Sequence, residues 1–377
     1  MGSPKNYSTK ARRIAYSFPR LSFIGIQVNF WILAIFLYSF LTYMSFSYIS
    51  QLHDINFPLS IQGLIISSLS IGLILGIFLG IVDLLLIKIG IHSLPSGLVI
   101  LLRTIVYPLA VFLILIFIRF FLLDLMSALI GSDYSNLFEN EFTWHYYFWS
   151  LLIYIAFMAA VISFINQMNN MFGPGILIPL LMGKYRNPVE EERFFMFLDM
   201  KSSVEHAENL GHLEYSALIR DCFIDLNKVL IKNNAEIYQY VGDEAVITWP
   251  TDEGKRNMNC LCLFFDFQKE LKKKHAYYTS HYGSIPEFKA GLHLGTITAV
   301  EVGRIKREIA YHGDTINTAA RIQSVCNQYG ESFLISKPVK ALLSNNNIEY
   351  NFPYLGEISL KGKTHTVELF GVEKSSS

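Results

Sequence analysis

Two adjacent carboxylates, Asp243 and Glu244, stand between two strand-like segments in "EIYQYVGDEAVITW", residues 236–249. A further carboxylate, Asp199, follows the apolar run 194–198. Mg²⁺ prefers oxygen ligands and is commonly held by one or two carboxylates together with substrate phosphates. Asp199 and Asp243, brought together, would therefore suit a divalent metal. A Gly-Asp pair is also ordinary hairpin-turn chemistry, so the segment taken alone fits a plain turn better than a metal site.

A second polar group lies further along, in "HGDTINTAARIQ" at residues 312–323. Asp314 is placed to cap a helix that starts at Thr315. Asn317 and Arg321 are four residues apart and share one helix face, where they can bind a sugar oxygen and a phosphate or simply face solvent. In "SLKGKTHTVELFGV", Lys361 offers a cation at a strand turn, within reach of phosphate.

The elements that must position these side chains alternate between strand and helix patterns. Residues 194–198 predict a strand buried on both faces, 203–231 a helix, 236–249 a hairpin and 256–277 a second helix. Further strands are predicted within 287–313, followed by a helix from residue 315 and by strands at 332–336, 348–360 and 365–372. The order is β-α-β-β-α-β with additions, an α+β ferredoxin-like arrangement. The first strand then lies beside the hairpin, which brings Asp199 close to Asp243.

Four segments occur along the chain in this order: "FLDMKSS", "YVGDEAV", "HGDTINTAARIQ" and "LKGKTHTVELFGV". On these segments, residues 190–373 resemble the class III nucleotidyl cyclases. The resemblance implies that Asp199, Asp243 and the backbone carbonyl of Met200 bind metal, with Glu244 only a neighbour. It implies that the backbone of residues 200–204 cradles phosphates. The remaining residues to which it assigns roles are the transition-state pair Asn317 and Arg321, the phosphate-binding Lys361, and the substrate-binding Ser202 and Ser203.

The activity implied by the resemblance is adenylate cyclase: ATP is converted to 3′,5′-cyclic AMP and pyrophosphate. The ribose 3′-hydroxyl attacks the α-phosphate in line, with two Mg²⁺ or Mn²⁺ ions per site. Family members act as dimers, so a homodimer with composite sites is implied. Gln239 and Ala310 occupy the base-reading positions and match neither the adenylate nor the guanylate pattern. ATP is favoured because adenylate cyclases are the commoner bacterial members, and guanylate cyclase remains the alternative.

The first half of the chain is a predicted membrane domain. Hydrophobic residues make up 52% of the 377 residues, concentrated before residue 184, and the formal net charge of zero gives no sign of nucleic-acid binding. Apolar stretches at about 23–49, 59–87, 94–118 and 146–168 are each long enough to cross a bilayer. Basic residues flank them so that both termini are predicted to be cytoplasmic, in a bacterial inner membrane. A cleaved signal peptide is not expected.

The predicted organisation is therefore an N-terminal all-α four-helix transmembrane domain and a C-terminal α+β domain. The segments are a cytoplasmic segment at 1–22, the membrane domain at 23–170, a linker at 171–192 and the cyclase domain at 193–373. Asp83 and Arg103 fall at the end of one span and inside another. They either mark a functional path or a pairing, or lie at the interface and snorkel.

Two rival readings belong to other classes. The hairpin resembles the "GGDEF" turn of diguanylate cyclases, which would leave Asn317, Arg321 and Lys361 without a purpose. Alternatively, the chain is a membrane receptor whose cyclase-like domain binds nucleotide but is catalytically silent. The signal or ligand that the membrane domain would sense is not indicated by the sequence.

Overall fold

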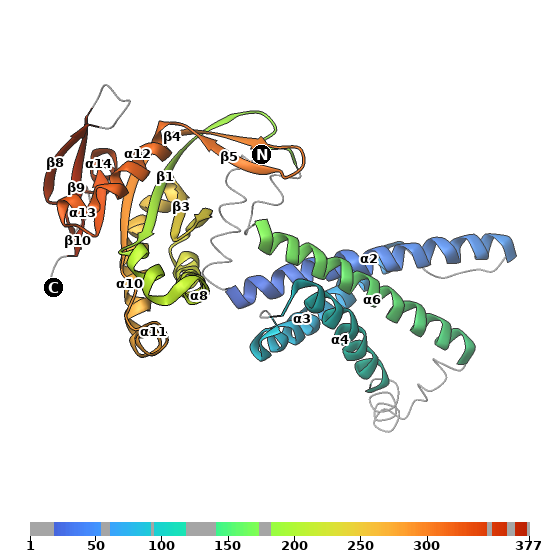
Figure 1. Cartoon of the computed structure of the whole chain (residues 1–377). Helices are drawn as coiled ribbons and strands as arrows, with labels where there is room; N and C mark the ends of the chain where they lie inside the picture. The colour runs from blue at the N-terminus through green and yellow to red at the C-terminus, as the bar shows by residue number, and fades with distance from the viewer. Residues whose placement is uncertain are drawn as a thin grey trace. The chain divides into compact units, whose positions relative to one another are not determined.

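The structure is a computed structural model that describes residues 19–53, 61–91, 94–117, 141–172, 182–344, 349–359 and 366–374 (Figure 1). The chain divides into two compact units after Gly175.

Four long helices make up the described part of the first unit. They are α2 (Pro19–His53), α3 (Ile61–Ile89), α4 (Ser96–Phe117) and α6 (Glu141–Phe172). Each contains a segment of 22 residues or more that is apolar enough to span a membrane, above the roughly 20 residues that a bilayer requires. The four apolar stretches predicted from the sequence are confirmed, although α6 begins several residues before the predicted residue 146.

Helices α2 and α3 pack with their backbones in close contact. A Cβ added at Gly72 would lie 2.6 Å from the Cα of Ile32, and one added at Gly76 would lie 2.6 Å from the Cα of Val28. Glycines one turn apart are what allow such close helix contacts inside membranes, where dispersion contacts replace the hydrophobic effect. Any larger side chain at these two positions would force the helices apart.

A buried ion pair connects α3 with α4. Arg103 Nε lies 2.7 Å from Asp83 Oδ1, and Arg103 Nη2 lies 3.0 Å from Oδ2, a bidentate arrangement. Gln27 of α2 donates to Asp83 and Ser163 of α6 accepts from Arg103, each at 3.4 Å. Asp83 is 0% exposed and Arg103 is 7% exposed. Neither charge therefore snorkels to the interface: they pair in the bundle core, with contacts from all four helices.

The second unit is built on a mixed sheet with the strand order β2-β3-β1-β4-β6-β9-β8, and β5 pairs with β4 off this path. Its strands are β1 (Val189–Met200), β2 (Glu236–Val241), β3 (Glu244–Pro250), β4 (Phe288–Val302), β5 (Glu308–His312), β6 (Phe333–Ser336), β8 (Tyr354–Ser359) and β9 (Thr366–Gly371). Short strands β7 (Tyr350–Asn351) and β10 (Glu373–Lys374) pair with each other. The order β2-β3-β1-β4 is that of the predicted ferredoxin-like core.

Helices cover both faces of this sheet (Figure 1). They are α8 (Ser203–Lys232), α9 (Thr251–Lys255), the 3₁₀ turn η4 (Arg256–Met258), α10 (Asn259–Lys273), α11 (His275–Tyr282), α12 (Asp314–Ser324), α13 (Cys326–Tyr329) and α14 (Lys337–Leu343). Side chains of α8, α10 and α14 share one buried cluster. Those of α12 belong to clusters on the other face.

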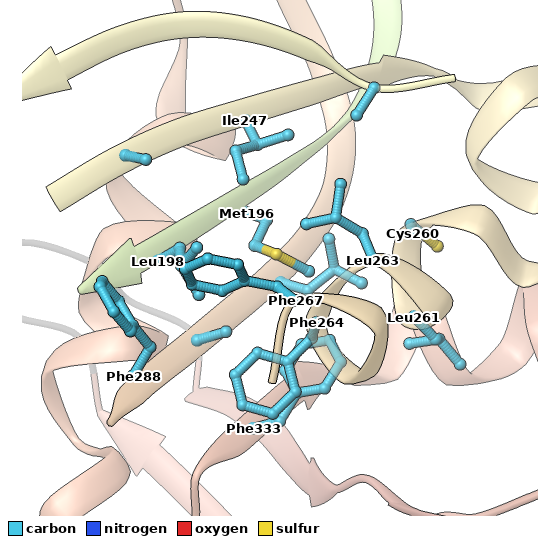
Figure 2. Close-up of a cluster of buried hydrophobic side chains, with 14 of the residues drawn as sticks. Met196, Leu198, Ile247, Cys260, Leu261, Leu263, Phe264, Phe267, Phe288 and Phe333 are labelled. Atoms are coloured by element: carbon cyan, nitrogen blue, oxygen red, sulfur yellow. The ribbon is translucent and has the colours of Figure 1, made fainter. Parts of the chain in front are cut away.

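Strand β1 is the central strand that both faces share. Met196 and Leu198 point into the α8 and α10 side, where Figure 2 shows them among Phe267 and other buried aromatic residues. Phe195 and Phe197 point to the α12 side. All four are at most 8% exposed. The predicted strand buried on both faces is confirmed, and the alternation places the next odd residue, Asp199, on the α12 face.

Three predicted element boundaries were wrong. β1 begins at Val189, five residues before the apolar run 194–198 that predicts it. The single helix predicted over 256–277 is broken, because Asn257 and Met258 have positive φ angles of 48° and 53°. Asp314 is the first residue of α12 and does not cap it from outside: Gly313 occupies the cap position. In addition, α8 is interrupted at Gly211, whose φ of 72° is not helical.

Helix α12 lies directly on β4, because the strand has glycine beneath it. A Cβ added at Gly291 would lie 2.2 Å from the backbone nitrogen of Gln323 and 2.8 Å from the carbonyl oxygen of Ala319. Gly291→Ala should push α12 off the sheet and destabilise the full chain by about 1 to 3 kcal/mol. Thermal unfolding in detergent measures this. Thr296→Ala is the control, because Thr296 is exposed on the same strand. An equal melting temperature for both variants would contradict the close packing.

Candidate active site

Asp199 lies in a row of charged residues across three strands. In the strand register it is directly opposite Glu244 of β3 on one side and Lys289 of β4 on the other. Lys289 Nζ lies 3.3 Å from Asp199 Oδ2. From α12, Gln323 Nε2 donates to the same oxygen at 2.8 Å. Two donors therefore approach one carboxylate oxygen, while Glu244 places a second acid beside it.

Asp243 is held at this end of the sheet by a two-residue turn between β2 and β3. Val241 pairs with Glu244, and Gly242 has a φ of 61°. A positive φ at the first central residue is the pattern of a type II′ turn, which explains the glycine. The Oδ2 atom of Asp243 is buried and has no hydrogen-bond partner among the described residues. The structure therefore brings Asp199 and Asp243 together, as the sequence predicts.

The acids at this site repel one another. Burial raises the pKa of Asp199, and the neighbouring charge of Asp243 raises it further, against the opposing effect of Lys289. Burial, followed by the charges of Asp199 and Asp243, raises the pKa of Glu244 to about 7. Crowded carboxylates with a buried, unpartnered oxygen are the environment that a cation relieves. The residues present therefore fit a divalent ion.

The ion would need ligands beyond these side chains. Within the described ranges, no group of three or more His, Cys, Asp or Glu residues is arranged to hold a metal ion by itself. Mg²⁺ sites of this kind are completed by water and by oxygens of a bound phosphate. The predicted ligand Met200 ends β1 with its side chain in the core, 2% exposed. Its backbone carbonyl as a ligand stays a prediction.

The turn after β1 leads into the first turn of α8. Ser202 has a left-handed φ of 52°, and its side chain does not cap the helix that Ser203 begins. The first N–H groups of a helix have no partner inside it and readily bind anions. Beside this turn is an open cavity of about 760 Å³, which is lined by Lys201, Ser202, Glu205, residues 281–285 and Glu287, among others. Asp199 and Asp243 do not line it.

Asn317 and Arg321 lie on the outer side of α12. Asn317 is exposed and Arg321 half-buried, whereas Thr318, Ala319 and Ile322 face the sheet. Among the described residues, neither Asn317 nor Arg321 forms a hydrogen bond or ion pair with Asp199 or Asp243. Within one chain, no such bond therefore joins the two predicted halves of the site.

The two predicted base-reading residues lie on different strands. Gln239 is exposed on β2, after a bulge at Ile237, and Ala310 is half-buried on β5. Their neighbours Tyr238 and Tyr311 pack against each other, with ring centroids 4.8 Å apart. The aromatic pair thus fixes β2 relative to β5. Lys361, the predicted phosphate ligand, lies outside the described residues.

Glu244, Lys289 and Gln323 complete the site, although the sequence did not identify them as partners of Asp199. Glu244 was expected to be only a neighbour of Asp243, yet it lies directly across the strand pair from Asp199. Lys289 carries a signal that could have been used, because a charged residue stands within the otherwise buried run 288–292. Gln323 is 5% exposed on the inner face of α12, and helical periodicity identifies such a position.

Comparison with known proteins identifies a family for the second half of the chain. The family described as "Adenylate and Guanylate cyclase catalytic domain" matches residues 189–373. Adenylate cyclase 2 of Rhizobium meliloti is 32% identical over 60% of this chain and 62% of its own length. Receptor-type guanylate cyclase gcy-8 of Caenorhabditis elegans is 26% identical over 48% of this chain and 16% of its own length. This chain therefore spans less than two thirds of either relative.

One solved structure is similar to half of this chain: the adenylyl cyclase CyaB from P. aeruginosa is 18% identical, with a TM-score of 0.45, over 50% of this chain and 97% of that chain. The family match and the sequence relatives show that residues 189–373 are a class III adenylate and guanylate cyclase domain, homologous to adenylate cyclases, and that four apolar helices precede it.

Proposed function

We propose that this protein is a membrane-bound adenylate cyclase that converts ATP to 3′,5′-cyclic AMP and pyrophosphate for intracellular signalling. The observation that carries the proposal is the pairing of Asp199 with Asp243, whose buried Oδ2 has no partner in the described structure. A structural acid pair would have its oxygens satisfied by donors, whereas a metal ligand leaves one free.

Asp199 and Asp243 would hold two Mg²⁺ or Mn²⁺ ions. Such ions promote ionisation of the ribose 3′-hydroxyl and neutralise charge on the triphosphate. The first turn of α8, with Ser202 and Ser203, binds the phosphates through its N–H groups, and Lys361 adds a cation. The chain itself thus holds the triphosphate so that the 3′-hydroxyl lies in line with the leaving pyrophosphate.

Asn317 and Arg321 act on the substrate held by a second copy of the chain. Their position on the outer side of α12 supports this, since they point away from their own core. Exposed apolar side chains near the acid turn and the start of α8 also need a cover: Val241 is 50% exposed, Val204 70% and Leu213 89%. In the homodimer, Asn317 orients the ribose, and Arg321 meets the charge that grows on the α-phosphate.

ATP is the proposed substrate because adenylate cyclase 2 of Rhizobium meliloti is the relative with the highest identity named above. The test offers ATP and GTP separately to the purified full chain with Mn²⁺ and identifies the products. Cyclic AMP as the main product supports the proposal. Cyclic GMP as the main product would establish the guanylate cyclase alternative. No cyclic product from either nucleotide would favour the silent receptor.

Gln239 is the residue proposed to read the base. Its amide both donates and accepts, so it can bond to either purine, whereas Ala310 offers only contact. Gln239→Ala should raise the KM for ATP roughly three- to tenfold, the value of one hydrogen bond, and leave kcat nearly unchanged. Gln328→Ala changes an exposed glutamine of α13 and serves as the control. An unchanged KM would show that Gln239 does not contact the base.

The proposed location is the bacterial inner membrane, with both termini and the cyclase domain in the cytoplasm. Basic residues before the first span and after the fourth support this orientation. Alkaline phosphatase fused after residue 55 should then be active, and fused after residue 184 inactive. The reverse pattern would place the catalytic domain outside. We also propose that the membrane domain responds to a ligand or partner, whose identity the sequence does not indicate. The formal net charge of zero gives no sign of a nucleic-acid partner.

A further inference from the structure

One polar side chain of α12 reaches across to the acid pair. Gln323 is 5% exposed, and its Nε2 donates to Asp199 Oδ2 at 2.8 Å. Lys289 Nζ approaches the same oxygen at 3.3 Å. Both donors therefore hold Oδ2, so that the other oxygen of the carboxylate stays available for a metal ion.

The backbone that carries Gln323 is fixed by the sheet. Gly291 of β4 allows the Gln323 backbone nitrogen to lie against the strand, where a Cβ would come within 2.2 Å of it. One turn further, Cys326 Sγ donates to the carbonyl oxygen of Ala290 at 3.4 Å. The chain is therefore held against β4 by α12 at Gln323 and again at Cys326, the first residue of α13. Because its backbone is fixed in this way, the position of the Gln323 amide is set by the fold.

We infer that Gln323 is a positioning residue, which orients the Asp199 carboxylate for metal binding. The inference rests on the proposed function, since it requires that Asp199 binds metal. A structural role is the competing explanation, in which Gln323 only helps α12 to pack. The two explanations differ in which half of a composite site they affect. Metal positioning acts on the chain that supplies the aspartates, whereas helix packing also acts on the chain that supplies Asn317 and Arg321.

The first experiment measures metal binding directly. Gln323→Met keeps the length and packing of the side chain but removes its donor. Mn²⁺ affinity of the full chain is measured by electron paramagnetic resonance in the presence of 3′-deoxy-ATP, which lacks the attacking hydroxyl. We expect the affinity to fall about 10- to 100-fold, as is usual for groups that orient a metal ligand. Gln328→Met, on the exposed side of α13, should leave it unchanged.

The second experiment places the substitution in one chain of a mixed dimer. One chain carries Asp243→Ala and the other Arg321→Ala, so that a single intact site remains. That site takes its aspartates from the Arg321→Ala chain. Gln323→Met in the Arg321→Ala chain should raise the metal concentration for half-maximal activity about tenfold or more. The same change in the Asp243→Ala chain should leave it unchanged.

Each outcome decides the inference. Equal effects in the two chains, or unchanged Mn²⁺ affinity, would overturn it in favour of helix packing. Should Gln323→Met fail to fold, Gln323→Leu also removes the donor without adding a charge or a metal ligand, and should weaken Mn²⁺ binding by a similar factor. Retained affinity in that variant would also overturn the inference. A wild-type chain that neither binds Mn²⁺ with 3′-deoxy-ATP nor forms cyclic nucleotide would instead refute the proposed function.

Discussion

Full chains with Asp243→Ala and full chains with Arg321→Ala should each lose cyclase activity, and their coexpression should restore it. Removing one preorganised charge costs roughly 3 to 4 kcal/mol, a factor of hundreds in kcat. In a symmetric dimer, a mixed pair contains one site with intact aspartates from one chain and an intact Arg321 from the other. With random pairing, half of the dimers are mixed and each has one good site in two. Roughly a quarter of the wild-type activity should therefore return in the unseparated mixture, and roughly half in purified mixed dimers.

The measurement is cyclic nucleotide formation by affinity-purified mixed dimers, with a different tag on each chain. A matched control pairs Asp243→Ala with Asp199→Ala. Both of these changes damage the metal half of a site, so no mixed dimer has an intact one, and activity should stay low. No recovery in the first pair would contradict the shared site. Recovery in both pairs would show either that a substitution has reverted or that the two aspartates of one site come from different chains.

Asp83→Leu should strongly destabilise the membrane unit. The change leaves the Arg103 guanidinium buried at 7% exposure with its main partner removed. Removing one member of a buried ion pair typically costs about 3 to 5 kcal/mol, because the remaining charge keeps its desolvation penalty. The double variant Asp83→Leu with Arg103→Met leaves no such charge and should recover most of the loss.

Thermal unfolding of the full chain in detergent compares the two variants. The expected order of stability is wild type, then the double variant close to it, then the single variant well below. An equal loss in the single and double variants would show that the ion pair itself, and not the unpaired charge, determines the stability. Cyclase activity in membranes, measured on the same set, reports whether the pair also matters for the output of the catalytic domain.

The sequence could predict the meeting of Asp199 and Asp243 because both follow strongly patterned elements. A run of apolar residues identifies a central strand, and the glycine before Asp243 identifies a tight turn. Once the strand order is known, the two positions can only be neighbours. The same reasoning predicts burial of β1 on both faces. The four apolar spans need only length and composition, so they are equally visible in the sequence.

The contacts that tune the site could not be predicted in this way. The hydrogen bond from Gln323 to Asp199 joins residues 124 positions apart in the sequence. Neither hydrophobic periodicity nor composition indicates which residues so far apart come into contact. The helix break at Asn257 and Met258 is not predicted by a glycine or proline at these positions, because the positive φ angles fall on an asparagine and a methionine. For Asp83 and Arg103, charge alone leaves both pairing and snorkelling open. Only the relative orientation of helices α3 and α4 decides between pairing and snorkelling.

The pairing of Asp83 with Arg103 also bears on how the chain enters the membrane during synthesis. The two residues are 20 positions apart, so Asp83 leaves the ribosome before the arginine that neutralises it. Either charge alone at the centre of a bilayer helix costs about 2.5 to 3.5 kcal/mol in insertion. The two helices thus gain by entering the bilayer together as a hairpin, and the order of synthesis favours this because α4 follows α3 after a short connection.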